Sequence, residues 1–275
     1  MEKTLKSILN KHGFVFKKAY GQNFLTDSTL LNDIVKKAGV TEKDTVLEIG
    51  CGAGALTRVL CDNALRVIGY EIDNKLKPVL EETLSDKTNV KIFFRDVMKE
   101  NLSEVEQKLG DEYMLVANLP YYITTPIIMN FLENAKKLKS MAIMVQKEVA
   151  ERLSAKPGDS EYGAITVGIN LRGSAKIVAD VPREMFTPVP GVDSAVVKIE
   201  IERNKFLDVD LKKVRDAVRI AFSSRRKMLV NNFMNGYKLT RAKVEEIFIK
   251  TGIPLTVRGE DLSAEDYVNI VKIMG

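Results

Sequence analysis

The tetrapeptide Asn118-Leu119-Pro120-Tyr121 contains the residue types needed to bind a flat base that carries an exocyclic amine. The side-chain oxygen of Asn118 can accept one N–H of such an amine, and the carbonyl of Leu119, freed by the turn at Pro120, can accept the other. Two acceptors increase the electron density on the amine nitrogen. Tyr121 offers a ring for stacking, at about 1–3 kcal/mol per base. Taken alone, the tetrapeptide is explained slightly better as a strand that ends at a proline turn.

A second group of candidate residues is the glycine-rich segment Gly50-Cys51-Gly52-Ala53-Gly54, which follows an apolar run. With Ala55 it satisfies the loose dinucleotide-binding fingerprint, and Glu71 lies about 20 residues further on, so NAD is a possible ligand. The alternation of the three glycines favours S-adenosylmethionine, because it lets the backbone approach the methionine part of that cofactor. Glu48, just before the loop, can help to hold a cationic amino group. We therefore expect S-adenosylmethionine.

Polar side chains also stand where three further apolar runs end, at Glu71, Asp96 and Asn118. Because open α/β sheets bind ligands at the carboxyl ends of their strands, we expect these side chains to share one site. There Glu71 suits ribose hydroxyls, Asp96 suits the adenine amine of the cofactor, and Asn118 suits the reacting amine. Each residue alone could be a helix cap or a turn residue, but the series, with Glu48, favours a ligand site.

Two segments far apart in the chain add candidate residues. Asn23 and the backbone around Leu25 belong to a stretch of amides and aromatics that could contact a ligand beneath the N-terminal tail. Phe186 begins a segment in which two prolines flank a valine, and prolines stiffen a loop. The functional interpretation makes Phe186 the second face of a base sandwich with Tyr121. The alternatives are a loop with a buried phenylalanine and an ordinary rigid turn.

Alternating strand and helix patterns must position these residues. Apolar runs predict strands over 45–50, 67–70, 90–95, 113–117, 141–145, 175–179 and 195–201. Helical spacing of apolar residues predicts helices over 2–11, 26–39, 55–60, 74–84, 126–132 and 147–152, whereas 162–170 could be helix or strand. Strands that are apolar on both faces and alternate with helices indicate a mostly parallel α/β sheet with helices on each side.

The composition is that of a soluble globular protein, with 45% hydrophobic and 29% charged residues among 275. No stretch approaches the ~18–20 apolar residues that span a bilayer, and the start lacks a secretory apolar segment, so we expect an intracellular protein. His12 is the single histidine, and Cys51 and Cys61 are the two cysteines. This inventory excludes a zinc cluster and Ser-His or Cys-His catalysis, and no metal is expected.

The net charge of +5 is unevenly distributed. Residues 1–20 contain five Lys and one Glu, residues 21–202 have a net charge of −5, and residues 203–228 contain nine Lys or Arg and three Asp. Two basic segments on an acidic body are typical of a polyanion binder, although basic helices are often only solvated faces.

A wholly helical pattern begins after residue 202, with helices predicted over 209–222, 226–234, 240–250 and 263–273. Arg225, Arg226 and Lys227 interrupt this pattern and are the candidate residues for binding a polyanion such as RNA. We therefore expect a catalytic domain with a basic tail over residues 1–204 and a helical domain over residues 205–275 that binds the polyanion, which the family resemblance described next implies to be RNA.

Four motifs occur in order along the chain: Gly21-Gln22-Asn23-Phe24-Leu25, Leu47-Glu48-Ile49-Gly50-x-Gly52-x-Gly54-x-Leu56-Thr57, Asn118-Leu119-Pro120-Tyr121 and Phe186-x-Pro188-x-Pro190-x-Val192-x-Ser194. Together with Phe222-Ser223-Ser224-Arg225-Arg226-Lys227, they resemble the KsgA/RsmA family of small-subunit ribosomal RNA adenine N6,N6-dimethyltransferases. The resemblance covers essentially the whole chain. Cys51 departs from the proline that many members carry, at a position of little consequence for cofactor contacts.

The resemblance implies a Rossmann-like class I methyltransferase domain with a mostly parallel seven-stranded sheet, and a small all-helical C-terminal domain. It implies transfer of methyl groups from S-adenosylmethionine to N6 of two adjacent adenosines in the 3′-terminal hairpin loop of 16S rRNA. The implied partner is a partly assembled small ribosomal subunit. The implied protein is a cytoplasmic monomer. Loss of such a protein typically confers kasugamycin resistance. The implied cofactor residues are Asn23, Leu25, Gly50, Glu71, Asp96 and Asn118, and the implied catalytic residues are Asn118, Leu119, Pro120, Tyr121 and Phe186.

Several alternatives remain at this point. A related antibiotic-resistance family methylates adenine N6 in 23S rRNA and shares the glycine loop and a similar Asn-x-Pro-Tyr. A DNA adenine methyltransferase would need a large base-reading domain, which is not apparent. An NAD-dependent dehydrogenase lacks an evident catalytic His or Tyr-Lys pair here and leaves the basic helices unexplained. A non-catalytic ribosome-assembly factor with the same fold is opposed by the presence of Asn118 and Glu71.

Overall fold

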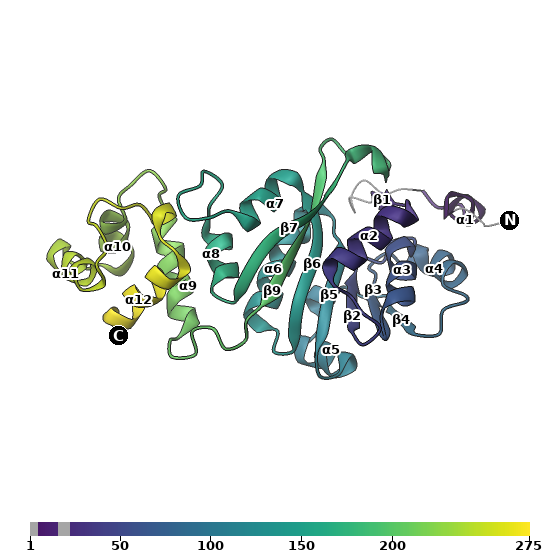
Figure 1. Cartoon of the computed structure of the whole chain (residues 1–275), viewed down its shortest axis with the longest axis horizontal. Helices are drawn as coiled ribbons and strands as arrows, with labels where there is room; N and C mark the ends of the chain where they lie inside the picture. Colours follow the sequence, from purple (N-terminus) through teal and green to yellow (C-terminus); the bar gives the residue numbers. More distant parts are fainter. Residues whose placement is uncertain (1–4, 16–22) are drawn as a thin grey trace. The chain divides into compact units, whose positions relative to one another are not determined.

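The computed structural model describes residues 5–15 and 23–275, apart from the side chain of Lys6, and they form two compact units (Figure 1). The first unit contains the described residues up to Ala150 together with Lys176–Glu200, and the second contains Glu151–Ala175 and Ile201–Gly275. Part of the expected basic tail and the Gly21-Gln22 pair of the first motif lie outside the described residues.

A seven-stranded sheet forms the centre of the first unit, in the order β4-β3-β2-β5-β6-β9-β7. β2 pairs in parallel with β3 and β5, β3 pairs in parallel with β4, and β5 pairs in parallel with β6. β9 runs antiparallel to β6. The mostly parallel, seven-stranded Rossmann-like sheet is therefore confirmed. Its strands are β2 (Thr45–Ile49), β3 (Arg66–Tyr70), β4 (Val90–Phe93), β5 (Tyr113–Asn118), β6 (Leu138–Gln146), β7 (Gly173–Val181) and β9 (Ser194–Ile201).

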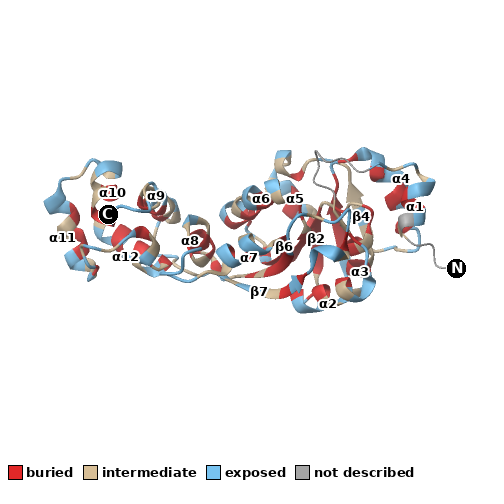
Figure 2. Cartoon of the chain, turned by 90° about the horizontal axis from the view of Figure 1, so that it is seen from above, coloured by how far each residue is buried: buried red, intermediate tan, exposed pale blue. Residues whose placement is uncertain are grey.

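Helices cover both faces of this sheet (Figure 2). α2 (Ser28–Ala38) and α3 (Ala55–Asn63) lie on one face, and α5 (Leu102–Leu109) and α6 (Tyr121–Asn134) lie on the other. Alternate strand residues such as Val46, Met114 and Val116 share a core cluster with α2 and α3, which leaves Leu47 and Leu115 facing the opposite layer. The central strands are buried on both faces, as the continuous apolar runs predicted.

Local capping sets the ends of these helices. α2 begins at Asp27, whose side chain accepts from the N–H of Leu30 at 2.8 Å, and it ends at Gly39 with φ +84°. α5, for which no element was predicted, begins where the Asn101 side chain accepts from the N–H of Ser103 at 3.0 Å. The predicted helix over 74–84 is a 3₁₀ turn (Asn74–Leu76) followed by α4 (Lys77–Thr83), with Pro78 in its first turn.

α6 begins five residues earlier than predicted. The expected helix started at Pro126, but α6 starts at Tyr121, directly after Pro120, and contains Pro126 in its interior. A proline inside a helix removes one N–H, here the one that would reach the carbonyl of Tyr122, and the rest of the helical hydrogen bonds can form. The earlier start matters because it places Tyr121 on a rigid element.

The N-terminal segment packs beside the glycine loop. α1 (Leu5–Lys11) packs against α4, and Lys11 and His12 approach the carboxylate of Glu82 at 2.6 Å and 2.9 Å. Further on, the short strand β1 (Phe24–Leu25) pairs antiparallel with β8 (Phe186–Thr187), with Leu25 opposite Phe186. This two-stranded sheet joins the first and last motifs of the catalytic unit.

The second unit is helical. It contains α8 (Ala164–Asn170), α9 (Leu211–Ala221), α10 (Leu229–Tyr237), α11 (Arg241–Thr251) and α12 (Ala264–Met274), and the chain passes between the units within α7 (Lys147–Ser154), β7 and β9. Residues 151–175 belong to this unit, whereas the sequence placed them in the catalytic domain. Their apolar side chains explain the difference, because the buried Tyr162 joins the core of the helices and its hydroxyl donates to the carbonyl of Leu262 at 3.0 Å.

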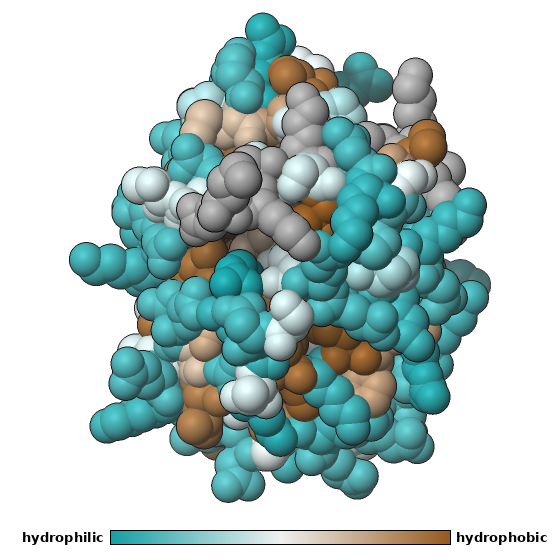
Figure 3. All heavy atoms as spheres, turned by 90° about the vertical axis from the view of Figure 1, so that its right-hand side faces the viewer, coloured by the Kyte–Doolittle hydropathy of each residue, from teal (hydrophilic) through white to brown (hydrophobic). Residues whose placement is uncertain are grey.

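The surface is largely polar on the face that carries the N-terminal elements, where apolar side chains form separate patches (Figure 3). None of the helices within residues 5–15 and 23–275 is long and apolar enough to cross a membrane.

Candidate functional site

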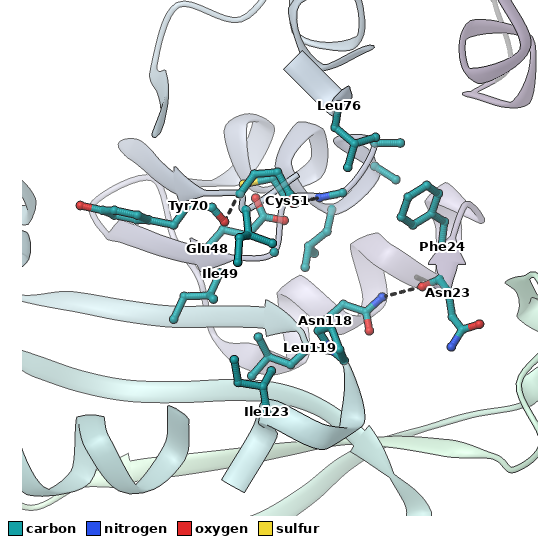
Figure 4. Close-up of a pocket in the computed structure, with 18 of the residues that line it drawn as sticks. Asn23, Phe24, Glu48, Ile49, Cys51, Tyr70, Leu76, Asn118, Leu119 and Ile123 are labelled. Atoms are coloured by element: carbon teal, nitrogen blue, oxygen red, sulfur yellow. Dashed lines mark hydrogen bonds between the residues drawn. The ribbon is translucent and has the colours of Figure 1, made fainter. Parts of the chain in front are cut away.

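A pocket in the first unit brings the predicted site residues of this unit together (Figure 4). It lies at the carboxyl ends of β2, β3 and β5, where a mostly parallel sheet binds ligands. The two-stranded sheet formed by β1 and β8 supplies another wall. The lining includes each residue predicted for the cofactor or the target base: Asn23, Leu25, Gly50, Glu71, Asp96, Asn118, Leu119, Pro120, Tyr121 and Phe186.

The glycine loop between β2 and α3 exposes its backbone to the pocket. Gly50, Gly52 and Gly54 all have positive φ angles, of +77°, +54° and +89°, which side-chain-bearing residues rarely adopt. A Cβ atom on Gly52 would lie 3.0 Å from the ring of Phe24. The loop therefore needs glycine for its conformation and for the close approach of the aromatic ring.

Glu48 is a buried carboxyl group at the pocket. It is fully buried within β2, lines the pocket, and neither of its oxygens accepts a hydrogen bond from the described residues (Figure 4). Burial raises the pKa of Glu48 to about 8, with a contribution from the charge of Glu71; the nearby Thr57 hydroxyl and Cys51 thiol offset this only in part and do not reach hydrogen-bond geometry. Such a carboxylate fits a ligand that carries a cationic amino group.

Glu71 holds the glycine loop as well as lining the pocket. Its carboxylate accepts from the N–H of Gly52 and from the N–H of Asp73, both at 2.8 Å. Burial raises the pKa of Glu71, and these backbone donors offset part of that effect. Since an ionised carboxylate has about four acceptor positions, Glu71 can accept from two backbone groups and still bind a ligand hydroxyl.

Asp96 follows β4 at the next strand end. Its side chain accepts from the N–H of Met98 at 3.0 Å and so caps the 3₁₀ turn Val97–Lys99. Asp96 therefore has both the capping role and the position at the pocket that were weighed as alternatives. Arg95 and Ile72 also line the pocket and were not predicted, because single residues in a turn carry no pattern.

Asn118 ends β5 and contacts the N-terminal segment. Its amide Nδ2 donates to the carbonyl oxygen of Asn23 at 3.3 Å, which directs the side-chain oxygen away from Asn23 (Figure 4). The bond joins residues 95 positions apart, one at a strand end and the other just before β1. It fixes the orientation of the amide that was predicted to accept a proton of the target amine.

The residues after Asn118 form the start of α6. Leu119 is buried, and the carbonyl of Pro120 accepts from the N–H of Ile123 at 3.1 Å and from the hydroxyl of Thr124 at 3.3 Å. Tyr121 is half-buried, and its hydroxyl lies 3.0 Å from the Oγ of Ser194. Tyr122 is 66% exposed and also lines the pocket. Its position beside Tyr121 was the available signal for this second aromatic, which was not predicted to line the site.

Phe186 lies opposite Leu25 in the pairing of β8 with β1. The two side chains belong to the same core cluster and both line the pocket, with Phe186 3% exposed. The structural and functional interpretations of Phe186 are therefore compatible. It is a core residue whose ring also forms part of the pocket wall.

The predicted RNA-binding residues lie in the second unit and differ from one another. Arg225 donates to the carboxylate of Glu260 at 2.9 Å and to the carbonyl oxygens of Ser160 and Tyr162 at 2.8 Å and 3.2 Å. Arg226 and Lys227 are exposed. Arg225 thus connects the loop before α8 to the turn before α12, whereas the other two cations face solvent.

The comparisons with known proteins agree with these features. Residues 13–275 match a family model described as ribosomal RNA adenine dimethylase. The chain is 44% identical over 269 residues to a ribosomal RNA small subunit methyltransferase A from Bacillus licheniformis, an alignment that covers 95% of this chain and 92% of the relative. A protein of the same name from Geobacillus kaustophilus is 42% identical over 272 residues, covering 96% and 93% of the two chains.

Two solved structures are similar over most of the chain. A dimethyladenosine transferase from Plasmodium falciparum matches with a TM-score of 0.77 and 26% identity, covering 90% of this chain and 95% of the other. The 23S rRNA methyltransferase ErmE matches with a TM-score of 0.72 and 26% identity, covering 91% and 98%. With its fold, its pocket and these relatives, the chain belongs to the ribosomal RNA adenine dimethylase family.

Proposed function

We propose that this protein transfers methyl groups from S-adenosylmethionine to N6 of two adjacent adenosines in the 3′-terminal hairpin loop of 16S rRNA, within the small ribosomal subunit. The observation that carries the proposal is the shared pocket of Glu48, Glu71 and the uncharged segment that begins at Asn118, in a chain of the rRNA adenine dimethylase family. The pocket offers one acidic end and one neutral end, as a cationic donor and a neutral amine require.

The acidic end suits the cofactor, which supplies an electrophilic methyl group on a sulfonium. Glu48 would hold the amino group, the glycine loop would contact the methionine part, and Glu71 would accept from the ribose hydroxyls. Asp96 would accept from the adenine amine. Asn23 and Leu25 would cover the cofactor from the side of β1. The support is that these residues line one pocket and that Glu48 is buried and accepts no hydrogen bond from the part of the chain that the structure describes.

The neutral end suits an adenine that has left its stack. Unstacking a base costs a few kcal/mol and is easiest in a loop, which is where sequence-specific RNA recognition usually takes place. The Asn118 oxygen and the Leu119 carbonyl would each accept an N–H of the amine, with Pro120 shaping the turn between strand and helix. Tyr121 and Phe186 would hold the two faces of the ring.

The reaction then depends on alignment rather than on a general base. Holding the amine nitrogen in line with the methyl group and excluding water lowers the barrier, and the amine proton can leave after transfer. The pocket lining contains no histidine, which is consistent with this route. A second round on the same nitrogen would give dimethyladenosine.

Exposed basic residues outside the pocket would bind the RNA backbone. Arg226 and Lys227 suit phosphate contacts, and Arg225 would support the loop that carries them. We propose a monomer that acts in the cytoplasm on the small subunit, with residues 205–275 as the RNA-binding part. The higher identity to the small-subunit relatives, 44% against 26% for ErmE, favours small-subunit over 23S rRNA.

Nucleoside analysis after reaction tests the proposal. Small subunits that lack the modification, mature small subunits and protein-free 23S rRNA would each be incubated with the protein and labelled S-adenosylmethionine. We expect label only in the undermethylated small subunits, recovered as N6,N6-dimethyladenosine. Transfer to 23S rRNA would support the resistance-type alternative, and binding to small subunits without transfer would support a non-catalytic assembly factor.

A further inference from the structure

Two adjacent residues, Asp193 and Ser194, contact the segments that carry Tyr121 and Phe186, the two aromatic walls of the pocket. They stand at the start of β9, where Ser194 pairs with Gln146 at the end of β6. The backbone carbonyl of Asp193 accepts from the N–H of Lys147 at 3.0 Å, which fixes the dipeptide to the chain that leaves β6. The dipeptide is therefore attached to the sheet itself.

Ser194 contacts the first aromatic wall. Its side chain is fully buried, and its Oγ lies 3.0 Å from the hydroxyl of Tyr121. The Cα of Tyr121 is held by the first turn of α6, and its phenol oxygen is held by Ser194 at the other end of the side chain. With both ends held, the long axis of the ring has little freedom to swing away from a stacked base.

Asp193 holds the turn that precedes the second aromatic wall, Phe186. Its Oδ1 accepts from the N–H of Arg183 at 3.0 Å, at the start of the 3₁₀ turn Arg183–Met185. Phe186 follows that turn directly, and its N–H donates to the carbonyl of Arg183. The position of the turn, and with it the backbone that carries Phe186, therefore depends on Asp193.

We propose that Asp193 and Ser194 form a clamp that sets the separation and the tilt of Tyr121 and Phe186. The proposal rests on the proposed function, in which these two rings hold the target adenine. A reactive geometry must be kept within a fraction of an ångström, and a single element that holds both walls keeps their relative position when either segment moves. Both residues are positioning residues, because they act through the rings and not on the substrate.

The Ser194 arm is tested by a double-mutant cycle on methyl transfer. Ser194→Ala and Tyr121→Phe each remove one partner of the same hydrogen bond, so each should lower kcat/KM for the RNA about fivefold, and the double variant should lose no more than either single variant. The affinity for S-adenosylmethionine should stay that of the unaltered protein. Ser140→Ala is the matched control, since Ser140 is buried in β6 at the end remote from the pocket and pairs with Glu200. It should leave transfer unchanged.

The Asp193 arm is tested by a conservative rescue. Asp193→Ala removes the acceptor for the N–H of Arg183 and should lower kcat/KM by a similar factor. Asp193→Asn keeps an oxygen that can accept this bond and should restore the rate. Both rates are compared at the same concentration of folded protein. A lower folded fraction of one variant would therefore not produce a difference between alanine and asparagine.

Several results would overturn the clamp. The first is normal transfer by Tyr121→Phe or Ser194→Ala. The second is a double variant whose loss of kcat/KM is the product of the two single losses. The third is an equal loss of kcat/KM for Asp193→Ala and Asp193→Asn. If Ser194→Ala failed to fold, Tyr121→Phe would still decide the matter, because the phenylalanine ring fits the same space. Failure of the unaltered protein to methylate adenine would instead overturn the proposed function.

Discussion

The two ends of the pocket are formed by neighbouring strands of one sheet but differ in charge: one end carries acidic side chains, and the other carries only uncharged ones. At the end formed by β2 and β3, Glu48 and Glu71 are buried carboxylates, and burial raises the pKa of both. At the end formed by β5 and α6, the residues from Asn118 to Tyr121 carry no formal charge, and Asn118 is oriented by a backbone carbonyl. Acidic groups that can ionise are placed where a cationic donor would bind and are absent where a neutral amine would react.

The difference also shows how each end is held. Glu71 accepts from the N–H of Asp73, two residues away, and from the N–H of Gly52, 19 residues away, so the proposed cofactor end is organised over a shorter stretch of chain than the base end. Asn118 and Tyr121 depend on Asn23 and Ser194, which are 95 and 73 residues away. The base end is therefore assembled by the tertiary fold, and it should be the more sensitive to distant substitutions.

The largest expected effect comes from Asn118→Ala. Removing the side-chain acceptor that we propose for the target amine should lower kcat by at least about 100-fold, in the range found when one preorganised polar group is removed from an active site. Cofactor affinity, measured by calorimetry, should be largely retained. Asn130 lies within α6 but does not line the pocket, so Asn130→Ala serves as the control and should keep nearly full activity. Full activity of Asn118→Ala would remove the proposed mechanism.

The acidic end of the pocket should make the affinity for S-adenosylmethionine depend on pH. Below pH 8 the cofactor-free protein holds a proton on Glu48, and binding of a cationic amino group requires its release. Affinity for S-adenosylmethionine should therefore rise with pH, by about tenfold per unit between pH 6 and pH 7.5, where the amino group of the cofactor stays largely charged. Glu48→Gln should abolish this dependence in a calorimetric titration.

The same shift has a consequence for stability. The folded, cofactor-free protein retains a proton on Glu48 that the unfolded chain would release above the usual pKa of 4.5. The contribution of this group to the free energy of unfolding should therefore fall as pH rises from about 4.5 to about 8. A pH-independent difference in stability between the unaltered protein and Glu48→Gln across that range would contradict the account of Glu48.

The exposed cations Arg226 and Lys227 lie outside the pocket, and replacing them should change RNA affinity by less than the substitutions within the pocket change activity. Alanine at both Arg226 and Lys227 should reduce the slope of log affinity for RNA against log salt concentration by about 1.4–1.8, the value for two phosphate contacts. Cofactor affinity should not change. Alanine at Arg241 and Lys243 is the matched control, because these cations of the same unit pair with Glu245 and Glu246. An equal change in slope for both pairs would show a general charge effect.

The smallest expected effect is that of Arg225→Ala. This side chain makes three intramolecular contacts but is half exposed, so its loss should lower the free energy of unfolding by only about 1 kcal/mol. Chemical denaturation would measure the change, with Arg226→Ala as the comparison. A larger loss of stability for Arg226→Ala would contradict the distinction between the two arginines.

Local sequence patterns predicted much of the catalytic unit. The apolar runs gave all seven strands of the main sheet, because strands buried on both faces are nearly continuous in hydrophobicity. The candidate residues at strand ends converge on one pocket for the same reason, since parallel strands end at one edge. The start of α6 was missed because Pro126 masks a helix that continues through it.

What the sequence did not predict are the contacts between distant segments. The Tyr121–Ser194 bond, the bond from Asn118 to Asn23 and the two roles of Glu71 depend on which segments the fold brings together. The place of residues 151–175 in the helical unit has the same origin, because Tyr162 is buried by helices from the C-terminal part. Periodicity reports which side of an element is buried, but it does not report the partner.

The most direct test of the account compares Glu48→Gln and Asn118→Ala side by side, measuring S-adenosylmethionine affinity and methyl transfer at saturating cofactor in the same preparations at pH 7.5. We expect Glu48→Gln to bind the cofactor more weakly yet to transfer at close to the normal rate once saturated. We expect Asn118→Ala to bind the cofactor nearly normally and to show no transfer. Loss of both properties in both variants would contradict the division of the pocket into a charged cofactor end and a neutral base end.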